Sequence, residues 1–132
     1  MVLVDTSALI SFLTGAETEA ARYLERLARE DAPFALTSVV VQEVLQGARD
    51  ERQWRRLHVY LTSQLQLEPR DPLETAVQSA RILFDCRRRG LTVRSGTDCW
   101  VAQIALEHDV PLLHDDRDYD AVGRVRPLKT LP

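Results

Sequence analysis

The sequence has few residues of the kinds that cross-link a chain or anchor it in a membrane. It contains two cysteines, one methionine and one lysine, and no apolar run approaches the ~20 residues that a spanning helix needs. Cys86 and Cys99 have neither metal-site spacing nor a disulfide framework, so we expect two buried free thiols. The first residues carry no basic segment, which argues against a secretory signal. We therefore expect a cytoplasmic protein without a membrane contact.

The charge balance excludes a strongly basic surface. There are 20 acidic and 17 basic residues, for a net charge of −3, so no general basic coat for nucleic acid is expected. Sixteen of the basic residues are arginine, and Lys129 is the exception. Arginine binds phosphate well through two parallel hydrogen bonds, but a GC-rich genome produces the same bias, so the ratio alone decides nothing.

The length and the apolar content predict one folded domain over residues 1–132. A chain of 132 residues with 45% hydrophobic residues hides roughly two-thirds of its unfolded surface, and this composition argues against disorder. Short apolar runs at 2–4, 34–36 and 111–114 predict buried strands, and 125–128 is a candidate for a last strand. Four helices are predicted to start at Thr6, at Thr18, at Thr37 or Ser38, and at Thr97. A further helix is predicted from the helical spacing of Trp54, Leu57, Leu61 and Leu65.

The clearest helix signal begins at Asp71. Asp71, Pro72 and Glu74 combine an N-cap carboxylate, proline at the first helical position and an acid three residues after the cap. Gly90 suits the position just past the end of this helix. One face of the helix is apolar and comprises Leu73, Ala76, Val77, Ala80, Leu83 and Phe84.

Strands that alternate with helices predict an α/β fold, in which helices flank both faces of a central, mostly parallel sheet. Ligands in such folds bind at the carboxyl ends of the strands, where the strand order reverses. Four segments bring an acid toward that edge. Asp5 directly follows the first strand, Glu43 lies in the helix after the second, Asp98 opens a helix, and an acidic loop at 115–118 follows the 111–114 strand.

Clustered carboxylates repel one another and raise one another's pKa values, so such clusters usually hold a divalent cation. Oxygen-only ligands favour Mg²⁺ or Mn²⁺, and Mg²⁺ commonly bridges carboxylates and substrate phosphates. One or two ions would suit phosphoryl transfer. Taken singly, Asp98 is an ordinary helix-start acid and Glu43 an ordinary surface acid. Asp5 is harder to dismiss because it ends a buried strand, and the joint placement carries the argument.

Four segments resemble the PIN-domain family, and within it the VapC toxins of bacterial toxin–antitoxin pairs. They are residues 4–10, 37–48, 98–105 and 112–119, in the family's order and spacing over nearly the whole chain. The last segment departs at two positions. His114 stands where threonine is usual, and Tyr119 stands where phenylalanine is usual.

The resemblance implies a single PIN-like domain that acts as an Mg²⁺-dependent endoribonuclease, with Mn²⁺ as a substitute. RNA would be cleaved by metal-activated water, leaving a 5′-phosphate. Asp5, Glu43, Asp98 and Asp116 would form the catalytic cluster, and the metal ligands would be Asp5, Asp98 and Asp116. Thr6, Ser7 and Asp118 would support the cluster. The resemblance also implies a homodimer and a cognate antitoxin that inserts a segment into the active-site groove.

Several other residues allow two interpretations. Arg94 and Arg87 could hold an RNA backbone, but basic residues also suit a solvated helix end. His114 is interpreted as a strand-end histidine rather than a general base. Trp54 and Trp100 have core spacing and are interpreted as packing residues rather than base-stacking platforms.

Two other functions compete with the nuclease. A phosphoacceptor receiver domain is also an α/β sheet with clustered acids, but its adjacent acids follow the first strand, whereas Asp115 and Asp116 come late here. A degenerate PIN domain would bind RNA or a partner protein without cleavage. All four family acids are present, which favours an active enzyme.

Overall fold

The structure is a computed structural model that describes residues 1–132. Strands and helices alternate along the chain, which confirms the α/β prediction. The elements in order are β1 (Leu3–Val4), α1 (Thr6–Leu13), α2 (Glu19–Arg29), β2 (Ala35–Leu36), α3 (Ser38–Leu45), α4 (Glu51–Thr62), β3 (Leu65–Gln66), α5 (Pro72–Arg88), α6 (Gly96–Glu107), β4 (Leu112–Leu113), α7 (Asp118–Gly123) and β5 (Thr130–Leu131).

The five strands form one parallel sheet in the order β3-β2-β1-β4-β5. Leu3 of β1 pairs with Ala35 on one side and with Leu112 on the other. From β1 the chain builds the sheet outward to β2 and β3, and it then returns to add β4 and β5 on the opposite side. The strand order therefore reverses between β1 and β4. This order differs from the 2-1-3-4-5 order of receiver domains, which removes that alternative.

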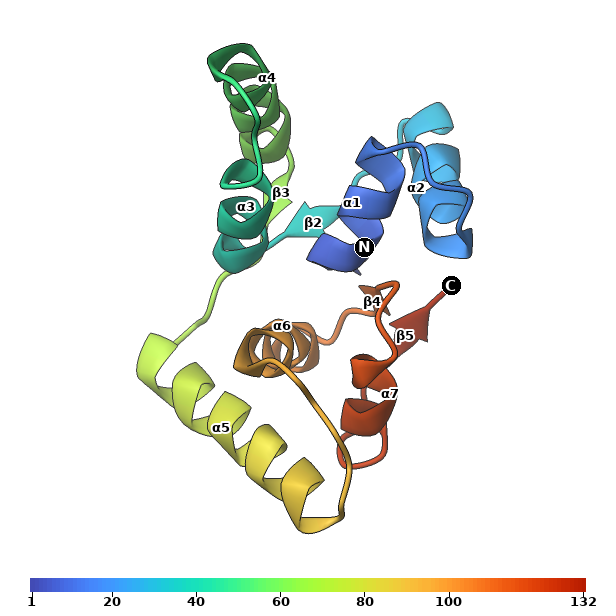
Figure 1. Cartoon of the computed structure of the whole chain (residues 1–132). Coiled ribbons are helices and arrows are strands. Elements are labelled where there is room, and N and C mark those ends of the chain that lie inside the picture. The colour runs from blue at the N-terminus through green and yellow to red at the C-terminus, as the bar shows by residue number, and fades with distance from the viewer.

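Helices cover both faces of the sheet (Figure 1). Helix α1 packs against α2 and α3, and α3 packs against α4, whereas α5, α6 and α7 pack against one another. Right-handed crossovers explain the division, because crossovers that progress in opposite directions along a parallel sheet cover opposite faces. A cluster of 25 buried residues, with all of β1, β2 and β4 in it, fills the space between the layers. None of the helices has the length and apolar composition needed to cross a bilayer.

The predicted helix starts at Thr18 and Asp71 are confirmed. The Thr18 hydroxyl oxygen accepts a hydrogen bond from the Ala21 amide, and the Asp71 carboxylate accepts from the amides of Leu73 and Glu74. Gly90, just past α5, has φ +71°, a conformation that glycine adopts without strain. Cys86 and Cys99 are buried free thiols, as expected.

Three local predictions are wrong. Leu65 lies in β3 rather than in the preceding helix, since α4 ends at Thr62 and Leu65 pairs with Ala35. Helix α6 begins one residue before Thr97, because the Ser95 hydroxyl accepts the Thr97 amide hydrogen and caps the helix. The last strand is Thr130–Leu131 rather than 125–128, where the Val125 amide bonds back to Val122 in a turn.

Helix α5 turns its apolar face outward. Leu73, Val77 and Phe84 are 75%, 52% and 51% exposed, although a helical apolar stripe normally marks the core side. The buried side carries Thr75 and Ser79 near its start and Ile82 and Cys86 near its end. The Thr75 hydroxyl donates to the Glu107 carboxylate of α6, and the Ser79 hydroxyl donates to the Thr75 carbonyl. These bonds satisfy the buried polar atoms.

Candidate active site

Asp5 lies at the carboxyl end of β1 and is buried. It is the N-cap of α1, and its Oδ2 accepts hydrogen bonds from the Ser7 amide at 3.0 Å and from the Ser7 hydroxyl at 2.6 Å. Its Oδ1 accepts a 2.6 Å hydrogen bond from the Tyr119 hydroxyl. Both oxygens are therefore held by protein donors, which fixes the orientation of the carboxylate.

The hydroxyls that open α1 connect the acids of different segments. Thr6 Oγ1 donates a 2.8 Å hydrogen bond to Glu43 Oε1, which ties α1 to α3. Ser7 Oγ, besides donating to Asp5, accepts the Asp115 amide hydrogen at 2.9 Å. The hydroxyls of Thr6 and Ser7 thus hold Asp5 at the end of β1, Glu43 on α3 and the loop after β4.

Asp98 differs from the other acids because no protein donor binds its carboxylate. It projects from the first turn of α6 and is half-buried. Burial raises the pKa of Asp98 to about 7, and the charges of Asp5, Asp116, Asp118 and Glu43 add to this effect. The negative charges of all the predicted cluster acids therefore favour the protonated form of Asp98, unless a bound cation neutralises them.

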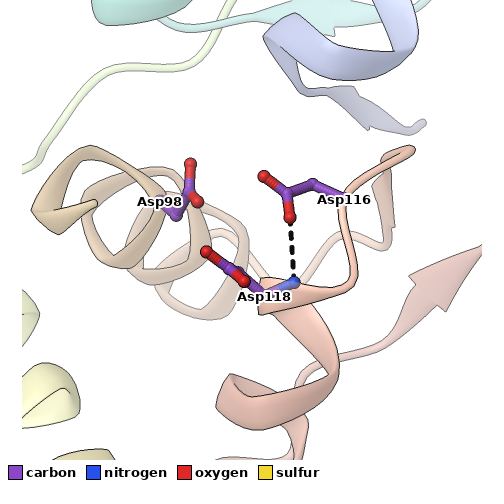
Figure 2. A group of neighbouring side chains, drawn as sticks. All are labelled: Asp98, Asp116 and Asp118. Atoms are coloured by element: carbon purple, nitrogen blue, oxygen red, sulfur yellow. Dashed lines mark hydrogen bonds between the residues drawn. The ribbon is translucent and has the colours of Figure 1, made fainter. Parts of the chain in front are cut away.

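Asp116 and Asp118 complete a compact group with Asp98 (Figure 2). Each of the three offers an oxygen, and these oxygens lie within 4.8 Å of one another. Asp116 Oδ1 accepts the Asp118 amide hydrogen at 2.9 Å, which holds the turn between β4 and α7. Asp118 is buried. The compact group therefore contains Asp118, which the resemblance gave only a supporting role, whereas Asp5 stands beside it.

Arg94 is the cation nearest to this group. Its backbone amide and its Nε both donate to Asp118 Oδ2 at 3.0 Å, and its Nη2 donates to Asp116 Oδ1 at 3.3 Å. The hydrogen bond from the Arg94 backbone amide lowers the pKa of Asp118, and the guanidinium adds to this effect, whereas burial opposes it. Arg87 is exposed on α5 and makes no ion pair with the cluster.

The donor set fits a hard divalent cation. It consists of carboxylate oxygens, it comes from separate segments, and one member lacks any protein donor. Mg²⁺ and Mn²⁺ prefer such ligands. Asp98, Asp116 and Asp118 offer the most compact set, and Asp5 and Glu43 border it.

The neighbouring histidine and cysteine are poorly placed for catalysis of their own. His114 Nδ1 accepts the Asp116 amide hydrogen at 3.2 Å, and the ring packs against Tyr119 with centroids 4.8 Å apart. Burial raises the pKa of the Cys99 thiol to about 11, so this group stays protonated at neutral pH. Tyr119 is the residue that sequence reasoning undervalued, since only the exchange of phenylalanine for tyrosine pointed to a hydroxyl there.

Two hollows are formed in part by residues of the acidic segments or by their immediate neighbours in the sequence. The first, of about 840 Å³, includes Arg94, His114, Asp116 and Arg117 in its wall. The second, of about 600 Å³, lies between α3, the segment before α5 and the start of α6, and includes Trp100.

Comparisons with known proteins identify the family of this chain. Residues 2–125 match the family model described as PIN domain. Ribonuclease VapC11 of Mycobacterium tuberculosis (strain ATCC 25618 / H37Rv) is 32% identical over 130 residues, which cover 98% of this chain and 96% of that protein. VapC ribonuclease Mb1587 of Mycobacterium bovis has the same identity and coverage.

Solved structures share the fold at lower sequence identity. DNA-bound VapBC from Salmonella typhimurium has a TM-score of 0.74 at 16% identity, covering 98% of this chain and 96% of that one. VapBC2 from Rickettsia felis, bound to a promoter DNA fragment, has a TM-score of 0.72 at 16% identity, with 99% and 98% coverage. At these identities the likeness shows the fold alone.

Proposed function

This chain belongs to the PIN-domain family, and from that premise we propose that it is an Mg²⁺-dependent endoribonuclease, the toxin of a toxin–antitoxin pair. The carrying observation is the convergence of Asp5, Glu43, Asp98 and Asp116 where the strand order reverses, with Asp98 left without a protein donor. The names of the relatives as VapC ribonucleases support the same activity. Such a protein would act in the cytoplasm, on cellular RNA.

The proposed roles follow from the contacts of each acid. Asp98, Asp116 and Asp118 would hold the cation, and Asp5, fixed by Ser7 and Tyr119, would border it. A bound Mg²⁺ or Mn²⁺ supplies charge neutralisation at the scissile phosphate and activation of water.

Glu43 is the residue that we assign to proton transfer. Its Oε1 accepts a hydrogen bond from Thr6, which orients the carboxylate, while its Oε2 accepts no hydrogen bond from the protein. That second oxygen is free to accept a proton from the attacking water.

The partner proposals rest on the resemblance and on the neighbouring structures. The structural relatives described above are VapBC assemblies, which supports a cognate antitoxin that occupies the active-site groove. We also propose a homodimer, for which the outward apolar face of α5 offers surface. Sedimentation of the purified chain tests whether it is a dimer. Inhibition of RNA cleavage by the co-expressed antitoxin tests whether the antitoxin occupies the active-site groove.

The primary test is cleavage of total cellular RNA with Mg²⁺, with Mn²⁺ and with EDTA. Asp98→Asn is the best inactive variant, because Asp98 makes no hydrogen bond whose loss would unfold the protein. Asp109→Asn is the matched control, since Asp109 is an exposed acid just past the opposite end of the same helix. Asp5→Asn disturbs a helix cap as well as the cluster.

We expect the wild type and Asp109→Asn to cut only with metal, and Asp98→Asn not to cut. Metal-independent cleavage, or full activity of Asp98→Asn, would contradict the proposal. RNA binding without cleavage in the presence of either metal would instead favour the degenerate PIN domain.

A further inference from the structure

The hollow beside Trp100 is built from two of the helices that also carry acids of the site, α3 and α6. Gly96 and Thr97, in its wall, immediately precede Asp98, and Gln42 immediately precedes Glu43. The same backbone segments therefore carry the wall of the hollow and two acids of the site. A substrate held across the acids would place its neighbouring atoms in or over this space. The complete lining is Ser38, Val39, Gln42, Glu68, Pro69, Pro72, Gly96, Thr97 and Trp100.

The lining suits a flat, uncharged group. Trp100 is half-buried, so part of the indole packs on the core while another part borders the hollow with Pro69 and Pro72. No lysine or arginine lies in the wall, so a phosphate would find no counter-charge there. The one charged group is Glu68, and its Oε1 accepts the Ser38 amide hydrogen at 2.7 Å.

The same wall offers polar side chains that the protein does not use. The hydroxyls of Ser38 and Thr97 and the carboxamide of Gln42 make no hydrogen bond with any protein group, and Gln42 is exposed. Hydroxyls and amides both donate and accept, so these groups suit the mixed edge of a nucleobase. A surface for stacking with adjacent donors and acceptors is the usual arrangement for single-stranded RNA bases.

We propose that this hollow binds one nucleobase of the RNA, stacked against Trp100 next to the scissile phosphate. The proposal rests on the ribonuclease function proposed above and adds a determinant of sequence preference to it. The larger hollow carries Arg94 and Arg117 beside the acids Glu19, Asp115, Asp116 and Asp120, and its two arginines are the groups that suit the sugar–phosphate backbone. The RNA strand thus passes from the Trp100 hollow, over the acids, to the two arginines.

The two tryptophans allow a direct optical test of stacking. Trp54→Phe leaves Trp100 as the only indole, because the chain contains two tryptophans. Trp54 lies on α4, where its ring packs beside His58, and it does not line the hollow. Single-stranded RNA hexamers of each base are titrated into this variant with Ca²⁺, which takes the same oxygen ligands with looser geometry. Anisotropy of end-labelled RNA measures binding independently.

We expect saturating RNA to quench the Trp100 emission, most strongly with one or two of the four bases. The matched protein Trp100→Phe, which retains Trp54 as its only indole, should show little quenching at the same occupancy. Trp100→Leu, which keeps an apolar side chain without the aromatic face, should bind RNA about tenfold more weakly. Its melting temperature tells whether it folds, and its stabilisation by Mg²⁺ should match that of the wild type.

Gln42→Ala is the second variant, since an exposed side chain can be shortened without loss of packing. We expect it to shift the preferred bases at the cleavage site, compared with the wild type at the same extent of cleavage. Unchanged Trp100 emission at full RNA occupancy, or wild-type cleavage sites and rates in both variants, overturns the base-binding proposal and leaves the nuclease intact. Quenching by the antitoxin but not by RNA assigns the hollow to the antitoxin and also overturns it. A wild type that neither binds nor cuts RNA overturns both proposals.

Discussion

The Tyr119 hydroxyl donates a 2.6 Å hydrogen bond to Asp5 Oδ1, although the two residues are 114 positions apart. Both side chains are buried, so the bond connects the end of β1 to α7 inside the protein. Burial, and then the charge of Asp5, raises the pKa of Tyr119 well above its usual value, which keeps the phenol protonated and donating. The PIN segments usually carry phenylalanine here, so this chain adds a donor to Asp5, the first acid of the proposed cluster.

Tyr119→Phe should therefore destabilise the metal-free protein by about 1–2 kcal/mol, because a buried carboxylate oxygen loses its donor. The freed oxygen gains room for a cation, so the increase in melting temperature on adding Mg²⁺ should be larger than in the wild type. Denaturant unfolding with and without Mg²⁺ measures both effects. Tyr23→Phe, on a half-exposed tyrosine of α2, is the control. Equal stability of wild type and Tyr119→Phe would contradict the role of this bond.

Asp98 should make the metal-free protein less stable as the pH rises from about 4 to about 7. The folded state holds the Asp98 proton up to a pKa of about 7, whereas an unfolded aspartic acid loses it near 3.9. The folded state therefore binds more protons across this window, and unfolding becomes easier as the pH increases. The change should be about 1–2 kcal/mol, because partial exposure reduces the full effect.

Asp98→Asn should remove that part of the pH dependence and raise metal-free stability at pH 8 by the same amount. Unfolding curves at pH 5 and pH 8 in EDTA check the difference, and Asp109→Asn should follow the wild type. Saturating Mg²⁺ should stabilise the wild type at pH 8 and leave Asp98→Asn nearly unaffected. A large loss of metal-free stability in Asp98→Asn would instead mark Asp98 as a structural residue at the start of α6.

Thr37→Val should leave stability unchanged or raise it by about 1 kcal/mol. Thr37 is the N-cap of α3, yet its side chain makes no capping bond, and its fully buried Oγ1 has no hydrogen-bond partner within the protein. Replacement by an apolar group of the same shape removes the cost of that buried hydroxyl. Thr37→Ser, which keeps the hydroxyl and loses a methyl group, should be destabilising. Thermal unfolding of the two variants distinguishes these effects, and a strongly destabilised Thr37→Val would contradict the expectation.

Arg94→Ala should reduce the salt dependence of RNA binding, whereas Arg87→Ala should not. The Arg94 side chain is 65% exposed, and its contacts with Asp116 and Asp118 leave N–H donors free for a phosphate. Loss of one phosphate contact lowers the slope of log K against log salt by about 0.7 for a single strand. Binding of a labelled RNA at several salt concentrations measures the slope. Equal slopes in wild type and Arg94→Ala would limit Arg94 to holding Asp116 and Asp118.

The sheet and the position of the acids could be predicted because both follow from local patterns. Short buried apolar runs predict parallel strands, and the carboxyl ends of parallel strands share an edge, so Asp5 and Asp116 had to approach one another. Strand β3 escaped prediction because Leu65 continues the helical apolar spacing of Leu57 and Leu61, and because both strand residues are exposed.

The details of the site depend on tertiary contacts that no local pattern reports. The pairing of Tyr119 with Asp5 and of Arg94 with Asp118 joins residues from separate segments. Trp100 packs against the core, as its spacing predicted. The spacing could not show that the start of α6, where Trp100 lies, also lines a hollow. Burial of Thr75 depends on the carboxylate that Glu107 supplies from α6, and burial of Ser79 depends on the Thr75 carbonyl.

In helix α5 the apolar positions should tolerate substitution better than the polar ones, because the apolar side chains are exposed and the polar ones are buried. Lysine or glutamate at Leu73 or Val77 should be accepted by the fold, since these positions face solvent. A larger apolar residue at Ser79 would meet α6 at close quarters and should not be accepted. Charged substitutions on the apolar face of α5 should therefore leave the single chain folded while they remove the surface proposed above for the homodimer, and the buried polar residues of the helix should be left unchanged.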